Sequence, residues 1–94
     1  MESKNKLRKS FIILNEKGLH TRPATELVKC ASIFKSQIFL IYGGVNVNAK
    51  SLFGILMLAA TRGAKIEIEA EGIDAEAAIA SIIKLATTKF NAHY

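Results

Sequence analysis

Hydrophobic residues along this 94-residue chain follow two kinds of spacing, one typical of strands and one typical of helices. The clearest strand pattern lies in AKIEIEAEG (64–72), where Ile66, Ile68 and Ala70 alternate with glutamates. Because successive strand side chains point to opposite faces, this segment should bury its apolar face and leave its acidic face in solvent. The pattern therefore predicts a half-buried strand.

Three further strands are predicted from β-rich runs that lie between turn-forming residues. They lie at residues 8–14, 38–42 and 45–48. The first ends in NEKG, a cluster typical of turns. The last two are separated by Gly43 and Gly44, a pair that tolerates positive φ at both positions of a two-residue hairpin turn.

Helical spacing predicts three helices. They lie at about residues 21–33, within SLFGILMLAATRG (51–63), and at about residues 74–89. Ser51 and Asp74 are the expected N-caps of the second and third helices, because short polar side chains accept hydrogen bonds from the first amides of a helix. The expected inner faces of the first and last helices comprise Ala24, Leu27, Val28 and Ala31, and then Ala75, Ile79, Ile82, Ile83, Ala86 and Phe90.

The predicted element order is β-α-β-β-α-β-α, in a single domain spanning residues 1–94. Four half-buried strands need cover on one face, and the helices supply it. We therefore expect an α+β fold, an open-faced two-layer sandwich with a four-stranded antiparallel sheet covered on one face by helices. Residues 1–7, which include Lys4 and Lys6, are expected to form a flexible basic extension.

The chain carries a net charge of +5, from 13 Lys and Arg and 8 Asp and Glu residues. This excess suits an acidic partner such as nucleic acid, a membrane surface or an acidic protein, and a solvated surface explains it equally well. No run of 18 apolar residues is present, so no membrane span is expected. Cys30 is the single cysteine, which excludes an internal disulfide and indicates a reducing compartment.

The segment KGLHTRPATELVKCA (17–31) places a histidine and an arginine at the start of a predicted helix. A helix start leaves backbone N–H groups without helical partners and carries a partial positive charge, so it favours anions. Arg22 adds a guanidinium that fits phosphate oxygens, and Pro23 pre-sets the first turn. Gly18 lets the preceding loop bend closely around the site.

His20 stands just before this helix start, so a phosphoryl group on one of its ring nitrogens would lie among the amides. Imidazole is a nucleophile near neutral pH and forms covalent intermediates. The arrangement explains a phosphoryl carrier that needs neither a metal nor another cofactor. A histidine that only caps the helix, beside a solvated Arg22, is the alternative that these residues leave open.

The run GLHTRPA (18–24) closely resembles the active-site motif of the histidine-containing phosphocarrier family, HPr, of the bacterial phosphotransferase system. A second run, AKSLFGILMLAATRG (49–63), resembles the regulatory-serine region of the same family. The resemblance covers about residues 9–90, and two separated motifs in the right order make it specific. It implies the βαββαβα fold and a small cytoplasmic, monomeric carrier that is not an enzyme with turnover of its own.

The resemblance also implies roles for individual residues. His20 would accept a phosphoryl group on Nδ1 from phosphorylated enzyme I, supplied by phosphoenolpyruvate. It would pass the group to the IIA component of a sugar transporter or to regulatory relatives. Arg22 would contact the phosphoryl group and help its transfer, with Gly18 and Thr21 also at the phosphate. The docking surface for acidic partners would comprise Leu19, Thr21, Lys29, Leu52, Phe53 and Leu56.

Lys17 departs from the family pattern, because many relatives have a small polar residue before the glycine. Its position is close to the expected phosphoryl site. A lysine here would either add attraction for the phosphoryl group or tune the choice of partner, and both interpretations stay open.

Ser51 is expected to cap a helix, and most such serines do only that. The resemblance adds a second role, because relatives that have an HPr kinase/phosphorylase are phosphorylated at the matching serine. A phosphate is favourable at a helix N-terminus, and its negative charge would repel acidic partners without a change of fold. Relatives without the kinase keep the serine, so both interpretations stay open.

The helix after Ser51 contains more apolar residues than one buried face needs. If Ile55 and Leu58 face inward, the remaining apolar side chains cannot all be buried. These side chains are Leu52, Phe53, Leu56 and Met57. An exposed patch for partner docking is one interpretation, and a short, nearly all-buried helix is the other.

Three other functions are compatible with the sequence. A nitrogen-related branch of the same family uses a paralogous enzyme I, and its output is regulation rather than sugar uptake. A basic nucleic-acid-binding module would explain the charge without any need for His20, but only Phe11 lies near the basic run, so a set of stacking aromatics is lacking. A corepressor partner regulated by a kinase would act through Ser51 alone.

Overall fold

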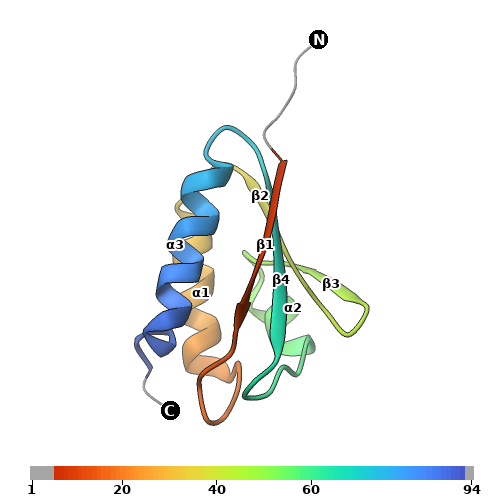
Figure 1. Cartoon of the computed structure of the whole chain (residues 1–94), viewed down its shortest axis with the longest axis vertical. Helices are drawn as coiled ribbons and strands as arrows, with labels where there is room; N and C mark the ends of the chain where they lie inside the picture. The colour runs from red at the N-terminus through yellow and green to blue at the C-terminus, as the bar shows by residue number, and fades with distance from the viewer. Residues whose placement is uncertain (1–5, 93–94) are drawn as a thin grey trace.

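The computed structural model describes residues 6–92 and contains four strands and three helices in the predicted order (Figure 1). The strands are β1 (Lys6–Ile12), β2 (Gln37–Tyr42), β3 (Val45–Asn48) and β4 (Lys65–Glu71). The helices are α1 (Thr21–Ser32), α2 (Leu52–Met57) and α3 (Ala75–Thr87), followed by a short 3-10 turn, η1 (Lys89–Asn91).

The strands form one antiparallel sheet in the order β1-β4-β2-β3. β4 is central and pairs with β1 on one side and with β2 on the other, so strands distant in sequence meet on it. Helices α1 and α3 lie side by side on one face of the sheet, and α2 packs against α1 and β3 (Figure 1). The expected α+β open-faced sandwich is confirmed.

The core lies between the sheet and the helices, and the predicted apolar faces supply it. On β4, Ile66, Ile68 and Ala70 are buried as predicted, while the alternating glutamates are only half-buried. Each fully buried isoleucine or leucine contributes about 1.5–3 kcal/mol to the free energy of unfolding. The largest fully buried apolar side chains are Phe90, Ile13, Leu27, Ile38, Leu40, Ile55, Ile66, Ile68 and Ile82.

The open face of the sheet is charged where β1 pairs with β4. Arg8 Nη2 lies 2.6 Å from Glu67 Oε1, and Lys6 Nζ lies 3.8 Å from Glu69 Oε2. Both pairs join neighbouring strands across the ladder, which keeps charged side chains in solvent along this edge of the sheet.

β1 begins at Lys6, not at Arg8 as predicted. Its first two residues pair with Glu71 and Ala70 at the end of β4. The predicted flexible extension at residues 1–7 is therefore wrong for its last two positions, and its first five lie outside the described residues. Charged residues are frequent on edge strands, where their side chains stay in solvent, so the charged residues on both sides of Leu7 hid the start of this strand.

The second helix lies within the predicted range, and the third ends earlier than predicted. α2 ends at Met57, and the chain leaves it through Ala59, which has a φ of 51°. α3 ends at Thr87 rather than Lys89. Within residues 6–92, no helix combines the length and the apolar character needed to cross a membrane.

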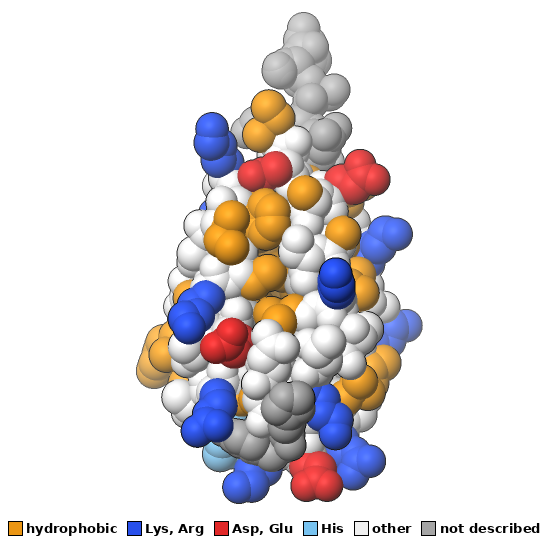
Figure 2. Space-filling model, turned by 90° about the vertical axis from the view of Figure 1, so that its left-hand side faces the viewer, with side chains coloured by type: hydrophobic (Ala, Val, Ile, Leu, Met, Phe, Trp, Pro, Cys, Tyr) orange, Lys and Arg blue, Asp and Glu red, His pale blue; other side chains and the backbone are white. Residues whose placement is uncertain are grey.

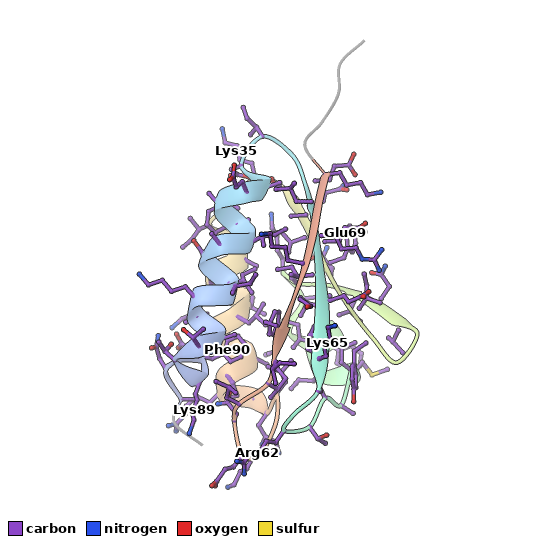
Figure 3. The ribbon with its side chains drawn as sticks, in the orientation of Figure 1. Lys35, Arg62, Lys65, Glu69, Lys89 and Phe90 are labelled. Carbon is purple, nitrogen blue, oxygen red and sulfur yellow. The ribbon has the colours of Figure 1, made fainter. Side chains whose placement is uncertain are left out.

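The C-terminal turn η1 is left-handed at three successive residues, with φ of 55°, 53° and 56° at Lys89, Phe90 and Asn91. Phe90 points into the molecule (Figure 3), and its ring centroid lies 6.0 Å from that of Phe11. The side-chain amide of Asn15 donates a 2.9 Å hydrogen bond to the carbonyl of Lys89. These contacts hold the turn despite its unfavourable backbone and tie the end of the chain to the loop that precedes α1.

Asp74 occupies the position before α3, as predicted, but its carboxylate does not cap that helix. The carboxylate accepts hydrogen bonds from the Ser36 hydroxyl and from the amides of Lys35 and Ser36, the latter two at 2.9 Å. The Ser36 hydroxyl and then the Lys35 amide do most to lower the pKa of Asp74 to about 2. The predicted cap is instead a tie between the start of α3 and the loop after α1.

The hairpin between β2 and β3 turns at Gly43 and Gly44, whose φ values are 58° and 79°. The predicted two-residue turn is confirmed. A Cβ atom at either position would meet nothing within 4 Å, so the backbone angle alone favours glycine here.

Candidate functional site

His20 ends the loop between β1 and α1 and is the N-cap residue of α1. Its backbone is extended, with φ −73° and ψ −178°, its side chain is exposed, and its ring makes no capping hydrogen bond. A histidine that only caps the helix is therefore excluded. Pro23 has no N–H, and the Ala24 amide donates to the His20 carbonyl at 2.9 Å. The helix-start amides nearest to His20 are those of Thr21 and Arg22.

In the first turn of α1, exposed polar side chains lie over a buried proline. Thr21 and Arg22 are exposed, and Pro23 is buried beneath them. The first turn contains no acidic residue, so no carboxylate of α1 opposes an anion at this helix start. Such a start favours a bound anion through its dipole and its N–H groups.

Gly18 holds the loop before His20 against the segment that follows α2. The Gly18 amide donates to the Asn15 carbonyl at 2.9 Å, and the Leu19 amide donates to the Ala60 carbonyl at 3.0 Å. Gly18 has φ 73°, and a Cβ atom there would lie 2.3 Å from the Ala60 carbonyl oxygen. Only glycine fits this position. The Gly18 amide is bonded to Asn15, so Gly18 shapes this loop through its conformation, and its expected place at the phosphate stays a prediction.

A shallow concavity of about 380 Å³ opens beside His20. Its walls come from the loop before α1, the first residue of α1, the end of α2 and the segment that follows α2. The lining residues are Lys17, Leu19, His20, Thr21, Leu56, Ala59, Ala60 and Thr61. The fold thus brings the two motifs singled out in the sequence to one site.

Leu19 does not lie on the exposed surface as expected. Its side chain is 5% exposed and belongs to the hydrophobic core beneath the concavity. The hydrogen bond from its amide to Ala60 holds this part of the loop close to the body of the molecule. The motif alone could not reveal this, because the covering segment lies about forty residues later in the chain.

Helix α2 exposes an apolar surface, which we call the α2 patch: Leu52, Phe53, Leu56 and Met57. Their side chains are 37%, 74%, 36% and 60% exposed, respectively. Ile55 is fully buried and Leu58 is 6% exposed, so these two residues form the inward side of this segment. The alternative of a nearly all-buried helix is therefore wrong. Leu56 also lines the concavity, which makes the α2 patch continuous with the surroundings of His20.

Ser51 is the N-cap of α2, as predicted. Its hydroxyl oxygen accepts a 3.0 Å hydrogen bond from the Gly54 amide. Ser51 is half-buried and directly precedes the α2 patch. A change of charge at this residue would therefore act next to the apolar surface.

Basic side chains surround the end of the molecule that carries the site. Figure 2 shows Lys and Arg side chains gathered at the lower end, and Figure 3 places Arg62 and Lys89 there, with Lys35 at the opposite end. Lys29 is exposed in the last turn of α1, and its Nζ lies 3.6 Å from Glu26 Oε2. This distribution suits an acidic partner.

Cys30 lies away from this site, on α1, where it is half-buried against the core. Burial raises the pKa of its thiol, so it favours the neutral, unreactive form. Among residues 6–92, no three His, Cys, Asp or Glu side chains come close enough together to hold a metal ion.

The residues that sequence reasoning missed are those of the segment after α2 and Asn15. Ala59, Ala60 and Thr61 line the concavity, and Ala60 contributes mainly its backbone carbonyl. Asn15 is fully buried and bonds to both the Gly18 amide and the Lys89 carbonyl. Small or turn-forming residues carry no chemical signal of their own, so only the tertiary contacts reveal these roles.

Comparisons with known proteins agree with this site. The family model described as "PTS HPr component phosphorylation site" matches residues 7–88. The phosphocarrier protein HPr of Treponema pallidum (strain Nichols) is 42% identical over 82 residues, which cover 87% of this chain and 93% of that protein. HPr-C-His from Thermoanaerobacter tengcongensis has a TM-score of 0.88 at 39% identity, covering 94% of this chain and 99% of that one. The HPr dimer from the same organism has a TM-score of 0.73 at 44% identity, covering 83% and 90% of the two chains.

The open-faced sandwich, the matched phosphorylation-site model and the similar carriers together define a phosphocarrier protein. The chain belongs to the HPr family of the phosphotransferase system. The resemblance seen in its two motifs is thereby confirmed.

Proposed function

We propose that His20 is the residue that carries the phosphoryl group. The observation that supports this is its exposed ring at the start of α1, not engaged in capping and beside a concavity open to a partner. The helix dipole and the first amides favour a charged group there. Arg22, exposed in the same turn, supplies a guanidinium whose fork fits phosphate oxygens, and Thr21 lies beside it.

The proposed chemistry is two successive transfers of one phosphoryl group. The lone pair of His20 Nδ1 attacks the phosphorus of phosphorylated enzyme I, and the bond to the donor atom breaks with its electron pair staying on the donor. An atom of a IIA component, or of a regulatory relative, then attacks the same phosphorus. The N–P bond breaks, and its electron pair returns to Nδ1. The carrier ends unchanged, so it is not an enzyme with turnover of its own.

Partners would dock on the surface that surrounds His20. The α2 patch supplies apolar area, and Lys29 supplies positive charge on the neighbouring helix. A net charge of +5 attracts acidic partners over a distance and speeds their encounter. Such a small patch suits brief complexes, which a shuttle between two partners needs.

Ser51 would be a regulatory site, modified by an HPr kinase/phosphorylase where one is present. Its hydroxyl caps α2 and directly precedes the α2 patch. A phosphate adds about −1.5 to −2 charge at pH 7. Acidic partners would be repelled from the patch, while the helix start tolerates the added charge.

The proposal places this carrier in the cytoplasm as a monomer that binds one partner at a time. In this proposal the carrier uses neither a metal nor another cofactor. Its partners are proteins, and neither nucleic acid nor a membrane is among them. The solved HPr dimer of T. tengcongensis makes the oligomeric state worth measuring by light scattering of the unphosphorylated and phosphorylated forms. Pairwise transfer assays with a sugar-branch and a nitrogen-branch enzyme I would decide the branch.

The direct test is to mix the chain with enzyme I and phosphoenolpyruvate. We expect one acid-labile phosphate per chain and none in the His20→Ala variant. Arg22→Ala should load more slowly, with the same urea midpoint as the unchanged chain. A His20→Ala variant that still accepts the phosphate, or an unchanged chain that accepts none, would refute the proposed role of His20.

A further inference from the structure

Three successive hydrogen bonds connect the C-terminal turn η1 to the backbone of His20. The side-chain amide of Asn15 donates through Nδ2 to the Lys89 carbonyl at 2.9 Å. The Gly18 amide donates to the Asn15 carbonyl, and the His20 amide donates to the Gly18 carbonyl, each also at 2.9 Å. The first of these bonds joins residues 74 positions apart, so the link between η1 and the loop depends on the side chain of Asn15.

Asn15 is an unfavourable residue for this position if only the stability of the core is considered. Its side chain is fully buried, and within residues 6–92 no protein group donates to its Oδ1. An apolar side chain would leave no acceptor without a protein partner, and such buried acceptors destabilise a fold. A carbonyl only accepts hydrogen bonds, so the bond to Lys89 requires the donor that Asn15 supplies. We therefore look for the role of Asn15 in this bond.

The turn at the other end of this bond has an unfavourable backbone as well. Lys89, Phe90 and Asn91 all have positive φ, which non-glycine residues adopt only where the surrounding structure holds them. Phe90 is fully buried against Phe11, and η1 packs against α1 and α3. Backbone outliers of this kind concentrate near functional sites. η1 is thus a firmly held anchor for the loop that carries His20.

We propose that Asn15 is a positioning residue for phosphoryl transfer, which orients His20 by tying its loop to η1. This inference rests on the proposed role of His20. The same loop is held on its other side by the hydrogen bond from the Leu19 amide to the Ala60 carbonyl. With both ties in place, the ring of His20 keeps one orientation at the start of α1. Without the tie of Asn15, the loop stays attached at Ala60, but the ring also samples orientations that do not suit attack on phosphorus.

The expected effect lies on the chemical step and not on the binding of partners. Asn15 is fully buried, so it cannot contact a partner. Small displacements of a reacting group lower the rate strongly, and we expect loss of the tie to slow transfer about tenfold. The apparent KM for enzyme I should stay within about twofold, because the α2 patch is unchanged. A residue that only stabilises the core would leave both values unchanged as long as the chain is folded.

The experiment compares five full-length chains: unchanged, Asn15→Ala, Phe90→Leu, the variant with both substitutions, and Ile38→Val. Phe90→Leu loosens η1 from the opposite side of the link, so the proposal can be tested even if Asn15→Ala does not fold. Ile38→Val is the control for a loss of core stability, because it removes one buried methylene group from β2, away from the site. All assays use a temperature at which circular dichroism shows the chains to be folded.

Each chain is loaded first with phosphoramidate, in the absence of any partner protein. In this reaction His20 attacks phosphorus, the P–N bond of the reagent breaks with its electron pair staying on nitrogen, and the protonated nitrogen leaves as ammonia. Loading is followed by mass spectrometry of the peptide that contains His20. Each chain is then loaded by enzyme I at several carrier concentrations, which separates kcat from KM.

Two results together support the proposal. Asn15→Ala loads about tenfold more slowly with phosphoramidate and has a lower kcat at unchanged KM with enzyme I, while Ile38→Val stays near the unchanged chain. Phe90→Leu slows loading when Asn15 is present and causes no further loss in the Asn15→Ala chain, because the link is already broken.

Equal rates for folded Asn15→Ala and Ile38→Val overturn the proposal and leave Asn15 a structural residue. A defect of Asn15→Ala in KM alone, with normal loading by phosphoramidate, also overturns it. So does a Phe90→Leu defect that is equally large with and without Asn15. If the unchanged chain is not loaded at His20 at all, the proposed role of His20 fails instead.

Discussion

The carbonyl oxygen of Ala60 lies only 2.3 Å from the point where a side chain at Gly18 would begin. The next residue of the loop, Leu19, donates its amide to the same carbonyl at 3.0 Å. The loop that presents His20 is thus pressed against the segment that follows α2. Because that segment continues from the α2 patch, these contacts hold the α2 patch and the loop that carries His20 together.

A Gly18→Ala substitution should destabilise the protein by at least about 2 kcal/mol, since it adds a backbone clash to a positive φ. Urea unfolding would measure the loss. Gly44→Ala is the matched control, because Gly44 has a similar φ of 79° but open space around its Cβ position. The control should lose about 1 kcal/mol. Equal losses at the two positions would show that the contact with Ala60 is unimportant.

Ser51→Ala should lower the free energy of unfolding by about 1 kcal/mol, because the Gly54 amide loses its capping acceptor. Ser51→Asp keeps an acceptor at the helix start and should stay close to the unchanged chain. The same Asp variant should accept phosphate from enzyme I more slowly, since its charge stands beside the docking surface. Thermal unfolding and transfer rates separate the two effects. Full transfer activity in Ser51→Asp would contradict the regulatory proposal.

Phe53→Ala should leave stability within about 0.5 kcal/mol, because the ring is already 74% exposed. Its apparent KM with enzyme I should rise about tenfold, as expected for an aromatic anchor in an interface. Ile73→Ala is the control, because Ile73 is 84% exposed and lies in the turn before α3, not on the docking surface. If both variants transfer phosphate alike, the α2 patch is not the docking surface.

The pH dependence of stability should reveal the tie between Asp74 and Ser36. The folded state lowers the pKa of Asp74 to about 2, below the value near 3.9 of an unfolded chain. Because the pKa of Asp74 is lower in the folded state, its ionised carboxylate stabilises the fold at pH values above the unfolded pKa. This stabilisation is lost as the pH falls from about 4 to about 2. Asp74→Asn should therefore be less stable than the unchanged chain at pH 7, and the difference should shrink across that window. Glu76→Gln removes an exposed acid in the first turn of α3 and controls for the loss of one negative charge at this helix start. A difference between Asp74→Asn and the unchanged chain that stays constant from about pH 7 to about pH 2 would contradict the tie.

The sequence by itself determined the element order and the inward faces, and it singled out the candidate residues for the chemistry. Period-two and helical spacings are local properties of the chain, so alternation at Ile66 and Ile68 already placed the half-buried strand. GLHTRPA (18–24) combined a nucleophile, a cation and a helix start within one short run. The element order and the inward faces need no knowledge of distant contacts, which is why they were predicted correctly, and the roles of His20 and Arg22 stay predictions.

Only the tertiary structure decided which distant segments meet at the site. It buried Leu19, brought Ala60 against Gly18 and directed the Asp74 carboxylate to Ser36 instead of to its own helix. It also placed Lys17 at the rim of the concavity beside His20. Each of these outcomes depends on packing between residues far apart in the chain, and local spacing carries no information about such contacts.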